Sequence, residues 1–78
     1  MLRDGARLAR EPLAPSARER EVIRLLVAGR SNDEIAGQLK ISRKTVEFHL
    51  TNIYRRYDLS GRVALAVQAL IGNWVDHP

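Results

Sequence analysis

The stretch that decides the fold is residues 31–57, SNDEIAGQLKISRKTVEFHLTNIYRRY. Ser31 precedes Glu34 by three positions, the spacing of a capping box, in which each side chain bonds the backbone N–H of the other residue at a helix start. A short helix of about two turns is therefore expected after Ser31, and its apolar side consists of Ile35, Ala36 and Leu39.

A second helix is expected almost immediately. Ser42 is a further candidate cap, and only Lys40 and Ile41 separate it from the first helix. A connection of about three residues between two helices is typical of a helix-turn-helix. We expect the second helix over about 42–57, with an inward stripe at helical spacing made of Val46, His49, Leu50, Ile53, Tyr54 and Tyr57.

One helix is expected before this pair. Ser16 and Glu19 repeat the capping-box spacing, and the helix after them should end near Ala28. Gly29 stands where a left-handed C-terminal cap is favoured. Its expected apolar face is Val22, Ile23, Leu25 and Leu26.

Another helix is expected after the pair. Ser60 is its candidate cap, and Gln68 is the only polar residue between Val63 and Ile71. The sequence thus predicts an all-α, four-helix (tetrahelical) helix-turn-helix domain over residues 15–75. Residues 1–14 are expected to form a flexible, linker-like segment whose arginines are more simply solvated than bound to DNA.

Composition limits the classes of function. A chain of 78 residues fits one compact domain, and the lack of cysteine excludes disulfides and thiolate metal sites. No apolar run approaches the roughly 18 residues of a membrane span, so a cytoplasmic location is the default expectation. The net charge of +4 suits a polyanionic partner without establishing one.

The last helix is apolar on every side, although a small domain can cover only one face of a terminal helix. We expect Val63, Ala66, Val67 and Leu70 to face the core. The residues left to pack against the same helix of a second copy, giving a homodimer, are Leu65, Ala69 and Trp74. The alternative to a second copy is a neighbouring domain, missing from this chain, that covers the apolar surface of the last helix.

The outer face of the 42–57 helix would enter the major groove of double-stranded DNA. The candidates for base contact are Lys44, Glu47, Phe48 and Thr51. Phe48 could cover a thymine methyl group, or it could pack onto the preceding helix as peripheral core. Glu47 could accept a hydrogen bond from cytosine, or it could pair with Arg43 one turn earlier.

Phosphate contacts are expected at helix starts and at arginines, because free N–H groups and positive charge both favour phosphate oxygens. The candidates are Ser31, Asn32, Ser42, Thr45, Arg55, Arg56 and Arg62. Ser42 and Thr45 could also serve only as caps.

No constellation typical of catalysis is present, so the sequence predicts neither an enzyme nor a cofactor site. His49 lies on the inward stripe, where a lone histidine is usually a core residue. It is too far from His77 in the pattern to suggest a metal site.

The strings 16–20, 29–36, 41–46 and 49–53, continued by 54–56 and 59–63, resemble the LuxR-type (GerE-like) DNA-binding domain over about residues 13–72. The resemblance implies a tetrahelical domain of a bacterial transcription regulator that dimerises through its last helix. Many family members carry lysine where this chain has Glu47 and Thr51, so their base contacts do not transfer.

The resemblance also implies partners beyond DNA. RNA polymerase is one candidate, and an N-terminal receiver or ligand-binding domain is another, which would make this chain a fragment rather than a stand-alone regulator. Two other classes stay open: the promoter-binding helix-turn-helix of sigma factors, and a helical protein-interaction module that does not bind DNA.

Overall fold

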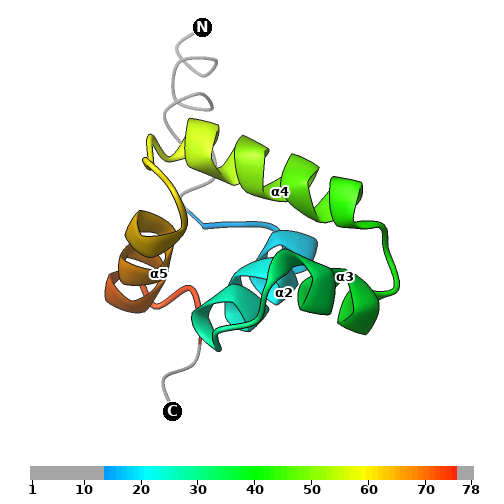
Figure 1. Ribbon diagram of the computed structural model, residues 1–78. Coiled ribbons are helices and arrows are strands. Elements are labelled where there is room, and N and C mark those ends of the chain that lie inside the picture. The colour runs from blue at the N-terminus through cyan, green and yellow to red at the C-terminus, as the bar shows by residue number, and fades with distance from the viewer. Residues whose placement is uncertain (1–13, 76–78) are drawn as a thin grey trace, which may run out of the picture.

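The computed structural model describes residues 14–75. Within that range it has four helices and no strand: α2 (Ala17–Val27), α3 (Asn32–Leu39), α4 (Arg43–Arg56) and α5 (Arg62–Ile71) (Figure 1). The predicted all-α, four-helix architecture is confirmed. The expected linker lies, except for Ala14, outside the described residues, as does His77.

Three helices begin at the predicted serines. The hydroxyl of Ser16 accepts from the N–H of Glu19 at 3.2 Å, and the Glu19 carboxylate accepts from the N–H of Ser16 at 3.0 Å. Ser31 and Glu34 form the same box at 3.1 and 2.8 Å. The Ser42 hydroxyl caps α4 by accepting from the N–H of Thr45 at 3.0 Å.

The start of α5 differs from the prediction. The residue that precedes the helix is Gly61, which has no side chain to cap it, and the first turn closes through the N–H of Leu65 and the carbonyl of Gly61 at 3.0 Å. The prediction of a Ser60 cap is therefore wrong by one residue, because the hydroxyl of Ser60 lies one position too early to bond the first free N–H groups.

Two left-handed residues end the first helices. Gly29 has φ 91°, as its position predicted, and lets the N–H of Arg30 reach the carbonyl of Leu25 at 3.0 Å. Lys40 has φ 58° and ends α3 in the same way, with the N–H of Ile41 donating to the carbonyl of Ala36 at 3.1 Å. The turn between α3 and α4 is then completed by Ser42, as the three-residue spacing predicted.

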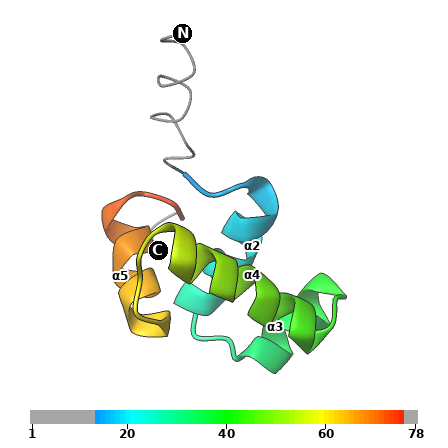
Figure 2. The ribbon, with the colours of Figure 1, turned by 90° about the horizontal axis from the view of Figure 1, so that it is seen from above.

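Helix α2 is the centre of the domain, because it contacts each of the other three helices. Figure 2 shows α4 crossing above α2, with α5 beside them on one side and α3 toward the other. The largest fully buried side chains come from all four helices: Val22, Ile23, Ile35, Val46, Ile53 and Leu65. The inward stripe of α4 is confirmed for Val46, Leu50 and Ile53, while His49 is only partly buried.

The faces of α5 differ from those expected: of the residues predicted to face the core, Ala66 packs against it and Leu70 is half-buried, but Val63 and Val67 are exposed. Leu65 and Ala69 are fully buried, and Trp74 is 6% exposed, so all three belong to the core of their own domain. Their prediction as an outer surface is wrong. The exposed side chains are Val63 at 77%, Val67 at 50% and Ile71 at 75%.

The end of α4 is fixed to the start of α2 by an ion pair. The guanidinium of Arg56 donates to both carboxylate oxygens of Glu19, to Oε1 at 3.1 Å. Burial opposes ionisation of Glu19, but the bonds from Arg56 and Ser16 together outweigh it and hold the pKa of Glu19 below its ordinary value. Arg56 therefore has a partner within the fold that the sequence did not predict.

Beyond α5, the chain turns back onto the core. Asn73 has φ 58°, and the Trp74 ring then packs against Tyr57 with ring centroids 4.6 Å apart and planes tilted by 52°. This contact covers the junction of α4 and α5. Within residues 14–75, no helix is both long and apolar enough to cross a membrane.

Candidate nucleic-acid interface

The outer face of α4 is polar apart from one aromatic ring. Lys44, Glu47, Thr51 and Arg55 are exposed, and Phe48 is 63% exposed. The ring of Phe48 lies beside that of His49, with centroids 6.1 Å apart and planes tilted by 58°. Phe48 is therefore not peripheral core, which was the alternative to an outward role, and the predicted base-contact residues do share one exposed surface.

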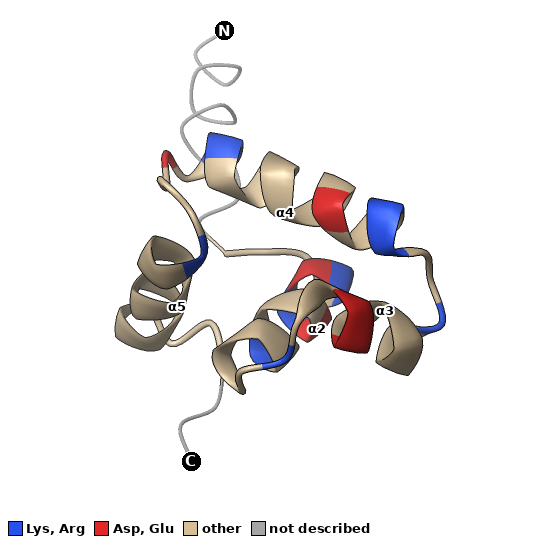
Figure 3. Cartoon of the chain, in the orientation of Figure 1, with Lys and Arg blue, Asp and Glu red and all other residues tan. Residues whose placement is uncertain are grey.

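The charges on α4 are distributed along its length (Figure 3). Arg43 and Lys44 lie in the first turn of α4, Arg55 and Arg56 lie in the last turn, and Glu47 lies between these two pairs. The positive charge of α4 is thus concentrated at the two ends of the helix.

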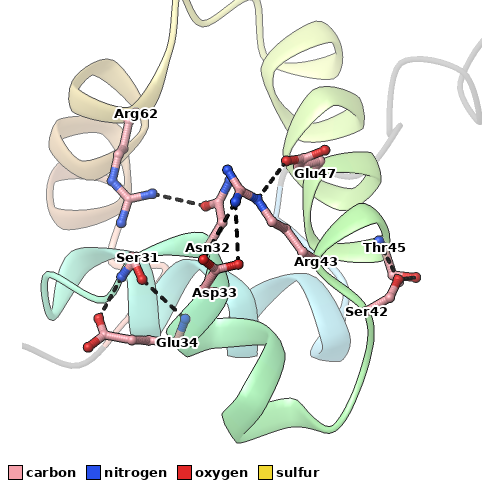
Figure 4. Close-up of polar contacts among 9 residues, drawn as sticks. All are labelled: Ser31, Asn32, Asp33, Glu34, Ser42, Arg43, Thr45, Glu47 and Arg62. Atoms are coloured by element: carbon pink, nitrogen blue, oxygen red, sulfur yellow. Dashed lines mark hydrogen bonds and ion pairs between the residues drawn. The ribbon is translucent and has the colours of Figure 1, made fainter.

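Arg43 connects α4 to α3. Its Nε donates to Glu47 Oε2 at 3.0 Å, and its Nη1 lies 3.4 Å from Asp33 Oδ1 (Figure 4). The pairing of Glu47 with Arg43 was one of two alternatives in the sequence and is confirmed. The participation of Asp33 was not predicted, because ten positions separate it from Arg43 and only the turn brings the two together.

A hollow of about 480 Å³ opens between the start of α3 and the start of α5. Arg62 spans it: Nη1 donates to Asn32 Oδ1 at 3.2 Å (Figure 4). Nη2 donates to the carbonyl of Arg30. Three of the predicted phosphate-contact residues thus line one site, although they come from different parts of the chain. These are Ser31, Asn32 and Arg62.

The capping residues at this site already have partners. Ser31 and Glu34 satisfy each other's backbone N–H groups, and the bond from the Ser31 N–H is the main cause that lowers the pKa of Glu34. At the start of α4, the hydroxyls of Ser42 and Thr45 lie 2.9 Å apart, so both take part in the cap. Arg55 is exposed near the other end of the helix.

Metal binding finds no support in this part of the chain. Among residues 14–75, no group of three His, Cys, Asp or Glu side chains is arranged to hold an ion.

The geometry defines a class of protein: a tetrahelical helix-turn-helix domain with the second helix of the motif exposed. Residues 15–69 match the family model of bacterial regulatory proteins of the luxR family (GerE). The chain belongs to this family, whose members are DNA-binding transcription regulators and not enzymes. This match decides for the luxR family over the sigma-factor alternative and over a module that does not bind DNA.

Relatives and a solved structure agree with the family match. The chain is 43% identical over 58 residues to the putative HTH-type transcriptional regulator YhjB of Escherichia coli (strain K12), covering 74% of this chain and 29% of that protein. It is 44% identical over 52 residues to the transcriptional regulatory protein LiaR of Bacillus subtilis (strain 168), covering 67% of this chain and 25% of that protein. The chain thus spans less than a third of the length of these relatives.

The fold is also similar to a solved structure of the transcription factor GerE. The TM-score is 0.75 at 37% sequence identity, and the match covers 80% of this chain and 92% of the other. The likeness thus extends over most of this chain and nearly all of the other.

Proposed function

We propose that this domain binds double-stranded DNA sequence-specifically by placing the outer face of α4 in the major groove. The observation that carries the proposal is the exposure of Phe48, at 63%, on an otherwise polar helix face. An apolar ring is costly to leave in water, whereas a thymine methyl group in the groove would cover it. Lys44, Glu47 and Thr51 lie on the same face and complete the set of base-contact candidates.

Phosphate contacts would flank the groove. The hollow at the start of α3 would contact one strand, because Arg43 and Arg62 bring positive charge beside the N-terminal end of the helix. The carboxylates of Asp33 and Glu34 also line it, and they are bound by Arg43 and by the Ser31 N–H. Ser42, Thr45 and Arg55 are the candidates along α4. Arg56 stays a candidate as well: its guanidinium binds Glu19, as that of Arg62 binds Asn32, and the residue is exposed.

We further propose that the functional form is a homodimer that pairs the exposed side of α5. Val63, Val67 and Ile71 recur every four residues and therefore form one apolar stripe. Symmetric packing of two such stripes would bury them both, and the paired α4 helices would occupy successive major grooves about one helical turn apart. RNA polymerase and an N-terminal receiver or ligand-binding domain stay predictions as partners.

The test is selection of bound sites from a library of random duplexes, followed by titration of the best site at several salt concentrations. We expect enrichment of a roughly two-fold symmetric sequence and an affinity that falls steeply as salt rises from about 50 to 200 mM, because phosphate contacts release counterions. No enrichment, or an affinity that does not depend on salt, would contradict the proposal.

A further inference from the structure

The bridge made by Arg43 leaves part of the Glu47 carboxylate available. Arg43 Nε bonds Glu47 Oε2, while Arg43 Nη1 is turned toward the Asp33 carboxylate (Figure 4). Within residues 14–75, no bond involves Glu47 Oε1. The bond to Oε2 therefore holds the carboxylate on the outer face of α4, while Oε1 can still accept a hydrogen bond.

Glu47 and Asp33 require this neighbour if the surface is to meet DNA. Two carboxylates beside a phosphate backbone are repelled, and together they would carry a charge of −2. With Arg43 between them the cluster carries −1, and the guanidinium also holds the Glu47 side chain in one place. A carboxylate that is partly neutralised and oriented can approach a base edge, where an unpaired one would be driven away.

We propose that Arg43 is a positioning residue that presents Glu47 Oε1 to the N4 amino group of a cytosine, so that the domain selects a C·G pair at this position. The inference depends on the proposed groove binding by α4. Cytosine offers a hydrogen-bond donor at the major-groove edge. Adenine also offers a donor there, but its N7 acceptor lies beside it and repels a group that can only accept.

A purely structural role for the bridge makes a different prediction. The side chains of Arg43, Asp33 and Glu47 are 59%, 71% and 47% exposed, and ion pairs as exposed as these contribute little to folding. Removing Arg43 should therefore leave the domain folded. A change of base preference at a single position would then report positioning, which a structural ion pair would not affect.

The experiment compares the 78-residue chain with Glu47→Gln and Arg43→Ala in selection from a random duplex library, with circular dichroism as the check on folding. Arg18→Ala is the matched control, because Arg18 pairs with Glu21 at 3.2 Å on α2 with similar exposure and lies on a different helix. The selected sites are then varied one base pair at a time to measure relative affinities.

We expect the parent chain and Arg18→Ala to prefer cytosine at one position of each half-site by about five- to tenfold, the lower end of a specific base contact. Glu47→Gln should shift that position toward adenine, with which an amide can pair, and Arg43→Ala should lose the preference there and weaken binding to all sites. The other positions should stay unchanged.

The outcomes separate the two proposals. If the parent chain enriches no sequence, groove binding by α4 fails. If it enriches a sequence but Glu47→Gln alters no position, or Arg43→Ala keeps the full cytosine preference, groove binding stands and the assignment of Arg43 and Glu47 is overturned.

Discussion

Glu19 and Arg56 join the beginning of α2 to the end of α4, and the Glu19 carboxylate does two things at once. It accepts a hydrogen bond from the N–H of Ser16 within the capping box, and it accepts hydrogen bonds from both terminal nitrogens of the Arg56 guanidinium. Arg56 also lies over the ring of Tyr57, 5.4 Å from its centroid. Helix α4 is thereby fixed at the end farthest from the helix-turn-helix turn.

The Glu19–Arg56 pair predicts a pH-dependent contribution to stability. Because the pKa of Glu19 is lowered on folding, its charge stabilises the domain above its ordinary pKa of 4.5. That contribution is lost as pH falls below 4.5 and through the folded pKa. Glu19→Gln keeps the cap but not the charge, so it should cost about 1 kcal/mol at pH 7 and much less at about pH 3, as measured by urea denaturation.

Glu34→Gln is the control for this effect. Glu34 forms the same capping box, but its side chain is exposed and makes no ion pair with another helix in the described part of the chain. A loss of stability in Glu34→Gln as large as that in Glu19→Gln would show that the cap, not Arg56, is responsible.

The exposed stripe of α5 predicts how assembly can be blocked without unfolding. Val67→Asp introduces a charge into a surface that would be buried between two copies, so we expect a folded monomer with DNA binding weakened by about tenfold or more, because the avidity of paired domains is lost. Sedimentation equilibrium and circular dichroism check the two properties. Leu65→Asp should instead unfold the domain, because Leu65 is fully buried. An unchanged dimer in Val67→Asp would exclude this face as the interface.

Phe48 predicts a separation of binding from stability. Phe48→Ala should change the free energy of unfolding by no more than about 0.5 kcal/mol, because the ring is exposed. It should still reduce the preference for thymine at one position of the selected site. Leu50→Ala, two residues along but 4% exposed, should cost about 2–5 kcal/mol. A comparable loss in Phe48→Ala would place the ring in the core.

Replacing either of two glycines with alanine is expected to change the stability of the domain, in opposite directions. Gly29 has φ 91° and open space where the methyl group of an alanine would lie, so Gly29→Ala should destabilise the domain by about 1 kcal/mol through backbone conformation alone. Gly37 lies inside α3 with equally open space, and Gly37→Ala should stabilise by about 0.5–1 kcal/mol. Thermal denaturation of both variants tests the pair, and equal signs would contradict it.

The sequence predicted those features that depend on neighbours along the chain. Ser16, Ser31 and Ser42 lie three residues before the N–H groups that they cap, and the left-handed Gly29 follows from its place after an apolar stripe. The ion pair of Arg43 with Glu47 spans one helical turn and could be anticipated for the same reason.

The faces of α5 could not be assigned in this way. Helical periodicity distinguishes inner from outer only when polar residues mark the outer side, and here Gln68 was the only marker. The partner of Arg56 lies 37 positions away, and that of Arg62 lies 30 positions away. Neither pairing leaves a signal in local spacing, so neither partner was predicted from the sequence.

The way α4 is held has a consequence for how such a domain can diverge. Val46, Leu50 and Ile53 bury the inner side of the helix, while Lys44, Phe48 and Thr51 are exposed on the outer side. If α4 meets DNA as proposed, substitutions at these outer positions would change the sequence preference with little effect on folding. Arg43 and Glu47 are coupled through their bond, so we expect changes at these two positions to occur together.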